Sequence, residues 1–100
     1  DEEAPSYRLE SPDTTHPYRQ KEVIELVNEK LKGRKEINQY DVLCIRRVYG
    51  INESRPDFYY KSKYGVPQYS SRFVKWIVQS YEEDSSFFDK AREKYRKHNR

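Results

Sequence analysis

One segment, residues 38–50, constrains the fold of this chain more than any other. Its letters, NQYDVLCIRRVYG, place apolar side chains around more than half of a helical wheel, which is typical of a helix covered by other elements. Asn38 suits an N-cap, Asp41 would lie near the positive end of the helix dipole, and Gly50 is a usual stop. We therefore predict a central buried helix with the remaining elements packed around it.

Three further segments repeat apolar side chains at helical spacing. They cover residues 18–32, a stretch from Ser70 or Ser71 to about Glu82, and a stretch that starts at Asp84 or Ser85 and becomes polar and frayed beyond Tyr95. Residues 58–69, FYYKSKYGVPQY, have the pattern of two short strands around a turn with glycine. We predict a mainly α fold of four helices with a short β-hairpin between the second and third, similar in outline to helix-turn-helix or winged-helix modules.

Charge and composition divide the chain near residue 16. Residues 1–16 contain five acids and one arginine, and since the whole chain has a net charge of +3, the remainder carries about +7. We predict an acidic flexible linker over residues 1–16 and a single small helical domain over residues 17–98. The chain has no methionine, and we expect it to be a piece of a larger protein.

Several classes of protein are disfavoured. No apolar run approaches the roughly 20 residues of a membrane span, so we expect no membrane partner. The lone Cys44 fits a reducing compartment, and we expect a cytoplasmic protein. Its place on the apolar face of a helix favours packing over catalysis. His16, Cys44 and His98 are too few to build a zinc site, and we expect no metal and no cofactor.

The letters RPDFYYKSK, residues 55–63, are similar to the start of some nuclease sites. Such sites hold a magnesium ion with the aspartate of a Pro-Asp pair and a second carboxylate two residues before a lysine. Here the residue two before Lys63 is Lys61, so the second carboxylate is missing. The three glycines stand apart, which excludes a phosphate-binding loop. We therefore predict that the chain is not an enzyme.

Basic and aromatic side chains gather around the predicted hairpin. Strand alternation turns Phe58 and Tyr60 toward the core and leaves Tyr59, Lys61 and Lys63 outside. Basic side chains neutralise phosphates, and a helix N-terminus offers backbone amides to them, so we predict a non-catalytic nucleic-acid-binding module, with DNA as the first expected ligand. The predicted phosphate contacts are Lys61, Lys63, Arg72, Lys75, Arg46 and Arg47, with Tyr59 and Tyr64 near bases or sugars.

Two other interpretations stay open. The hairpin could be only structural, as a half-buried strand whose lysines keep its edge soluble. Alternatively, Trp76, Leu43 and the hairpin tyrosines could form an apolar patch of a protein-interaction or dimerisation module. For Trp76 itself, a place at the edge of the core is favoured.

The block INQYDVLCIRRVYGI, together with the stretch that begins PDFYYKSKYGVPQYSSRF, resembles a C-terminal helical module of uncharacterised bacterial proteins, some of them associated with mobile elements or defence loci. The resemblance covers roughly residues 16–96 and is most distinctive in the run that starts at Tyr60. It implies an appended domain and a bacterial setting. It brings no established active site, so no functional residue follows from it.

Overall fold

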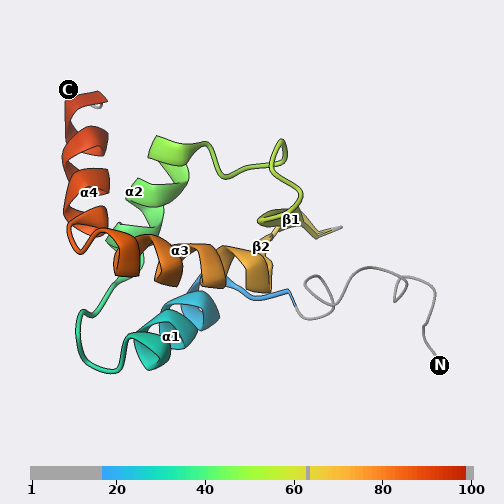
Figure 1. Ribbon diagram of the computed structural model, residues 1–100. Helices are drawn as coiled ribbons and strands as arrows, with labels where there is room; N and C mark the ends of the chain where they lie inside the picture. Colours follow the sequence, from blue (N-terminus) through green and yellow to red (C-terminus); the bar gives the residue numbers. More distant parts are fainter. Residues whose placement is uncertain (1–16, 63, 99–100) are drawn as a thin grey trace.

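The computed structural model describes residues 17–62 and 64–98 (Figure 1). The predicted linker and Lys63 lie outside the described residues. The elements follow in the order α1 (Gln20–Leu31), α2 (Gln39–Tyr49), β1 (Tyr59–Lys61), β2 (Pro67–Tyr69), α3 (Ser71–Glu83) and α4 (Phe87–His98). The predicted mainly α fold, with a hairpin between α2 and α3, is confirmed. The likeness to helix-turn-helix or winged-helix modules and the boundaries of the domain stay predictions.

Helix α2 begins and ends where its sequence predicts. Asn38 and Asp41 form a reciprocal capping box: the Asp41 amide donates to Asn38 Oδ1 at 3.1 Å, and the Asn38 amide donates to Asp41 Oδ2 at 2.9 Å. Gly50 closes the helix with φ 66°, a left-handed conformation in which a Cβ would be strained. Asp41, Val42, Cys44 and Ile45 of α2 are buried, as predicted, but α2 packs mainly against α4 and less against α1, so the other elements do not surround it on all sides.

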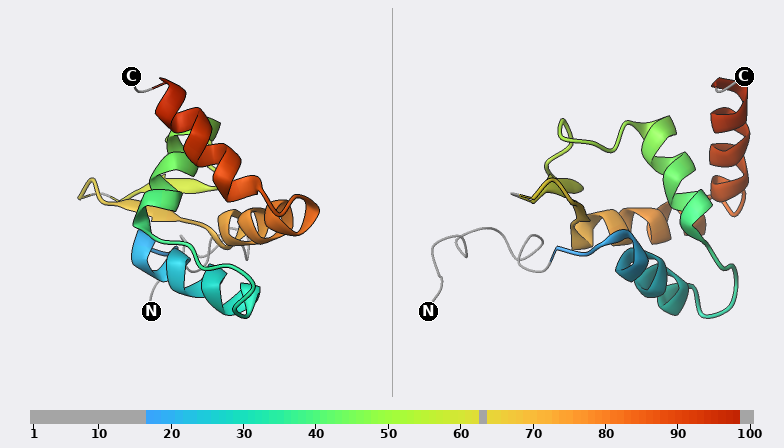
Figure 2. Two further views of the ribbon diagram at one scale, coloured as in Figure 1. Left: turned by 90° about the vertical axis from the view of Figure 1, so that its left-hand side faces the viewer. Right: turned by 180° about the vertical axis from the view of Figure 1, so that it is seen from behind.

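The helices pack in two pairs, α1 beside α3 and α2 beside α4 (Figure 2). The four apolar stripes meet between the pairs in one core, because each helix presents its apolar side chains on one face. The buried side chains of these stripes include Val23, Val27 and Leu31 of α1, Val42 and Ile45 of α2, Phe73, Val74 and Ile77 of α3, and Phe87, Phe88 and Ala91 of α4. No helix in the described ranges is long and apolar enough to cross a membrane.

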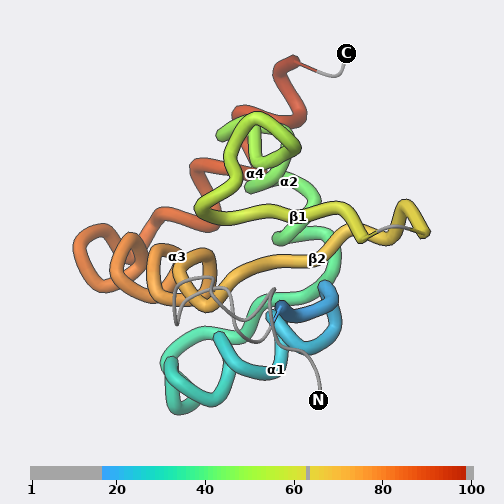
Figure 3. The backbone as a smooth tube through the Cα atoms, turned by 90° about the vertical axis from the view of Figure 1, so that its right-hand side faces the viewer, coloured from blue at the N-terminus to red at the C-terminus, as the bar shows by residue number. Residues whose placement is uncertain are grey.

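Strands β1 and β2 form a two-stranded antiparallel sheet beside the N-terminus of α3 (Figure 3). Tyr59 is paired with Tyr69 in the register of the sheet, and their rings lie 5.7 Å apart. On its other side β2 exchanges two backbone hydrogen bonds with Tyr18, at 2.6 and 2.7 Å. The hairpin is therefore held against the segment that leads into α1.

The predicted outward position of Tyr59 is wrong. Its side chain is only 4% exposed, and Tyr60, predicted to face the core, is half-buried. The cause is the turn before β1, in which the amides of both Phe58 and Tyr59 donate to the carbonyl of Arg55 at 2.9 Å. Phe58 is thus part of a turn and not of the strand, so alternation does not relate it to Tyr59 and both side chains face inward.

Trp76 lies at the edge of the core, the position that the sequence favours. Its ring is partly buried and lies 5.3 Å from the rings of Tyr49 and Phe58 and 5.5 Å from that of Phe87. This aromatic cluster joins α2, the turn before β1, α3 and α4. It also fixes the position of the hairpin relative to α2, on which the candidate site depends.

Candidate nucleic-acid interface

Arg46 leaves the last turn of α2 and reaches the hairpin. Its guanidinium carbon lies 5.2 Å from the centroid of the Tyr59 ring, and its Nε donates to the carbonyl of Ile51 at 3.5 Å. The charge of Arg46 also acts on Tyr69, whose pKa is raised by burial and partly lowered again by this guanidinium. Tyr59 is therefore a support for Arg46, and the burial of its ring speaks against its predicted contact with a base.

Lys61 lies in the same charge cluster. Its ammonium pairs with the carboxylate of Glu53 at 3.1 Å, and both side chains are more than half exposed. The hydrogen bond from Lys61 lowers the pKa of Glu53 and raises that of Lys61, and the charge of Arg46 lowers the pKa of Glu53 further. Because such an exposed pair contributes little stability, Lys61 can exchange Glu53 for another anion at small cost.

Arg47 is exposed at the end of α2. It lines a hollow of about 300 Å³ where the chain leaves the helix, together with Arg46, Gly50, Ile51 and Asn52. Within the described part of the chain, no carboxylate pairs with Arg47. Arg46, Arg47 and Lys61 surround the loop between α2 and β1, and we call these three residues the α2–β1 basic cluster.

The other predicted contacts are spread more widely. Lys75 lies in a different hollow, between α1 and α3, beside Lys30 and Tyr18. Arg72 is exposed in the first turn of α3. Tyr64 is 80% exposed in the turn of the hairpin. Lys63 lies outside the described residues. The structure thus brings together four of the eight predicted contact residues, the α2–β1 basic cluster and the buried Tyr59, and separates Lys75 from them.

The N-terminus of α3 is hydrogen-bonded within the domain through a buried side chain. Ser70 is its N-cap and is fully buried, with its hydroxyl donating to the carbonyl of Asp57 at 2.5 Å and accepting from the amide of Phe73 at 3.4 Å. The Ser70 hydroxyl is therefore used inside the domain, as a helix cap and as a tie to the turn before β1. A phosphate contact at this end of α3 would have to come from exposed residues such as Arg72.

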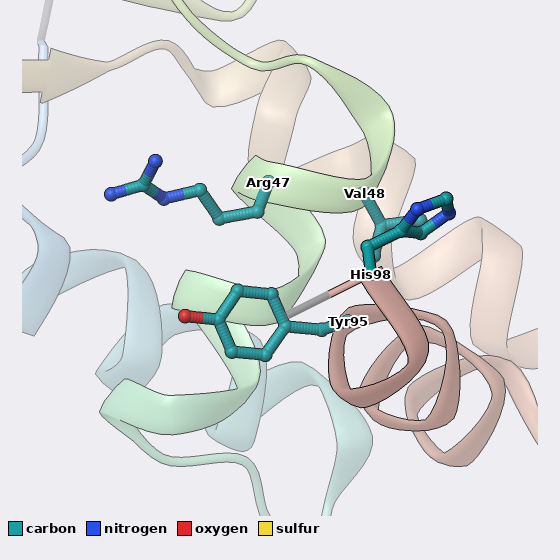
Figure 4. Close-up of a pocket in the computed structure, with 4 residues that line it drawn as sticks. All are labelled: Arg47, Val48, Tyr95 and His98. Atoms are coloured by element: carbon teal, nitrogen blue, oxygen red, sulfur yellow. The ribbon is translucent and has the colours of Figure 1, made fainter. Parts of the chain in front are cut away.

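A third hollow, which was not predicted from the sequence, lies between the last turns of α2 and α4 (Figure 4). It has a volume of about 310 Å³ and is lined by Arg47, Val48, Tyr95 and His98. The sequence predicted a frayed tail beyond Tyr95, but α4 continues to His98. The three-residue spacing of Tyr95 and His98, which places both on one helical face, was the available signal.

Residues 55–63, whose sequence is similar to the start of some nuclease sites, do not form a metal site in the part that the structure describes. Among the described residues, no group of three His, Cys, Asp or Glu side chains could hold a metal ion. Asp57 instead pairs with Arg55, its Oδ1 lying 3.4 Å from the guanidinium Nε. The prediction that the chain is not an enzyme is not tested by this arrangement.

Together the fold and the surface define a small, mainly helical domain with basic side chains grouped beside two hollows. Residues 11–92 match the family model described as EC042_2821-like Restriction Endonuclease-like domain, and the chain belongs to this domain family of uncharacterised proteins. No curated protein and no solved structure matches the chain. The match covers nearly the same residues as the resemblance found in the sequence, whereas the link to mobile elements or defence loci stays a prediction.

Proposed function

We propose that this chain is a nucleic-acid-binding module of a cytoplasmic protein, which holds phosphates through the α2–β1 basic cluster and does not cleave its ligand. The family name refers to restriction endonucleases, and this supports a ligand that is a nucleic acid. DNA is the first ligand to test. The comparison with helix-turn-helix modules rests on the outline of the fold alone.

The position of Arg47 carries this proposal. Its side chain is exposed, has no carboxylate partner in the described part of the chain, and lines both hollows at the end of α2. An arginine without an internal partner keeps its donors available for the planar recognition of a phosphate. No other predicted contact combines these three properties.

The neighbours of Arg47 add to its suitability. Arg46 is held by Tyr59 and by the carbonyl of Ile51, so less conformational entropy is lost when it contacts a ligand. Lys61 can leave Glu53 for a phosphate. Tyr64, exposed in the turn, could stack on a base of a single strand, and Lys63, Arg72 and Lys75 are proposed as further phosphate contacts at the margins.

The alternative of a protein-interaction module depends on an exposed Trp76, and this side chain is partly buried. Trp76, its proposed centre, is partly buried against the rings of Tyr49, Phe58 and Phe87, and Leu43 is half-buried. Only part of each side chain is therefore open to a partner, which disfavours a patch centred on Trp76. The alternative stays a prediction, and among its hairpin tyrosines Tyr64 is 80% exposed.

The test is a salt-dependent titration of duplex and single-stranded oligonucleotides with two matched variants, Arg47→Gln and Lys21→Gln. Each removes one positive charge from an exposed helix position, and Lys21 lies on α1, outside the cluster. We expect Arg47→Gln to weaken binding and to reduce the slope of log K against log salt for duplex DNA by about 0.9, because one counterion fewer is released. Lys21→Gln should leave the slope unchanged.

Two results would contradict the proposal. Undetectable binding of every oligonucleotide at low salt would exclude a nucleic-acid ligand. Equal slopes for wild type and Arg47→Gln would exclude the α2–β1 basic cluster as the phosphate contact, even if the chain still binds.

A further inference from the structure

The hollow between α2 and α4 is lined by basic, aliphatic and aromatic side chains. Arg47 and Val48 come from α2, and Tyr95 and His98 come from α4. Arg47 and Tyr95 extend in nearly the same direction, so that the guanidinium and the phenol oxygen lie toward one side, while His98 lies toward the other (Figure 4). A volume of about 310 Å³ is at the lower end of the range for small-molecule sites.

The ring of Tyr95 is held in place by a neighbouring ring of α2. It meets the ring of Tyr40 edge to face, with centroids 6.1 Å apart and planes at 80°. The guanidinium of Arg92 lies 5.3 Å from the centre of the Tyr40 ring and pairs with the buried Asp41 at 2.6 Å. This chain of contacts positions Tyr95 before any ligand arrives, which lowers the entropy lost on binding.

The charges around the hollow favour an anion. The last turns of α2 and α4 carry Arg46 and Arg47, and Arg96, Lys97 and His98. Part of this positive charge offsets the negative ends of the two helix dipoles, which together are equivalent to about one negative charge. Glu93, which pairs with Lys97 at 3.5 Å, offsets one more. Since Arg46 is turned to the hairpin, an excess of about one positive charge is left around the hollow, not counting His98.

We propose that this hollow binds a single unpaired nucleotide. Its phosphate lies at Arg47, its base packs against the Tyr95 ring and Val48, and the imidazole of His98 donates a hydrogen bond to the base or sugar at the far side. Paired bases present no free face to an aromatic ring, so the occupant is a nucleotide of a single strand or a free mononucleotide. The choice of a nucleotide as the occupant rests on the proposed function. The cationic and aromatic lining of the hollow is observed independently of that function.

The test is NMR of the full chain titrated with adenosine 5′-monophosphate, adenosine, inorganic phosphate and a single-stranded oligonucleotide. We expect the monophosphate and the oligonucleotide to shift the Val48 methyl and His98 ring signals, adenosine to do so more weakly, and phosphate alone to leave Val48 unmoved. Tyr95→Leu should weaken monophosphate binding at least fivefold, because it removes the stacking surface. Tyr81→Leu, the same change on α3 and outside the hollow, should leave it unchanged.

The outcomes separate this inference from the proposed function. If oligonucleotides bind with the salt dependence above but leave Val48 and His98 unmoved, the hollow is not a nucleotide site and the proposed function stands. If phosphate alone moves the same signals as the monophosphate, the hollow is an anion site and the inference is wrong. If the monophosphate binds but no oligonucleotide does, the hollow is supported and the proposed function is wrong. Should Tyr95→Leu fail to fold, His98→Gln at the exposed helix end decides, with weaker monophosphate binding expected.

Discussion

The carboxylate of Asp41 makes contacts in two directions. One oxygen accepts the amide of Asn38 at 2.9 Å and completes the capping box of α2, while the other pairs with Arg92 Nε at 2.6 Å. The side chain is 1% exposed, and its hydrogen bond is the main cause that raises the pKa of Arg92. Asp41 thus completes the cap that Asn38 begins and ties α2 to α4.

We expect Asp41→Ala to lower the free energy of unfolding by about 2 to 4 kcal/mol, since it removes one of the two bonds of the capping box and leaves Arg92 without its buried partner. Urea denaturation measures this change. Asp89→Ala is the control, because the Asp89 carboxylate is exposed and lies 3.7 Å from Lys35, and it should cost less than about 1 kcal/mol. An equal decrease in the free energy of unfolding for the two variants would show that the contacts of Asp41 do not stabilise the fold more than an exposed ion pair does.

At the scale of the element, the turn before α4 is held by Asp84. Its Oδ1 accepts the amide and the hydroxyl of Ser86, at 3.0 and 2.7 Å, and its Oδ2 accepts the ammonium of Lys90 at 2.7 Å. The hydrogen bond from Lys90, followed by those from Ser86, lowers the pKa of Asp84 to about 2. These bonds order the start of the helix that carries Tyr95 and His98.

We expect the carboxyl carbon of Asp84 to titrate with a midpoint near pH 2 in an NMR titration, below its ordinary value of 3.8. Because the pKa is lower in the folded state, the contribution of Asp84 to stability is present above about pH 4 and is lost as the pH falls through 2. Lys90→Met removes the main cause and should move the midpoint back toward 3.8. A midpoint unaffected by this substitution would contradict the role given to Lys90.

At the scale of the whole molecule, the packing of α2 beside α4 places the last turns of both helices around one hollow, and the aromatic cluster of Trp76 holds the hairpin beside α2. The basic residues of α2 therefore face two neighbours, the hairpin and α4. The proposed phosphate contacts and the proposed nucleotide site share Arg47, so a strand could contact both without leaving the surface of α2.

We expect plasmid DNA to stay intact when incubated with the chain and Mg²⁺ or Mn²⁺, because Lys61 occupies the place of the second carboxylate and Asp57 is engaged by Arg55. Gel electrophoresis of the plasmid checks this. Cleavage that disappears in Asp57→Asn, a variant that keeps the backbone carbonyl bonded to Ser70, would show that the chain is a nuclease and that its proposed non-catalytic role is wrong.

Sequence by itself determined the elements and their order. Helical spacing of apolar residues, the capping pair of Asn38 and Asp41, and the stop at Gly50 are local signals, and a helix is a local structure, so the chain carries enough information to place it. The basic character of Arg46, Arg47 and Lys61 was equally readable, since charge does not depend on the fold.

Tertiary structure alone decided which of these side chains meet. Tyr59 faces inward because a turn at Arg55 breaks the alternation, and it becomes the support of Arg46. Arg92 meets Asp41 across 51 residues of sequence, and the same packing brings Tyr95 beside Arg47 to form the hollow. Such contacts depend on how helices pack, which is set by the shape and volume of the whole core and not by the periodicity of any one segment.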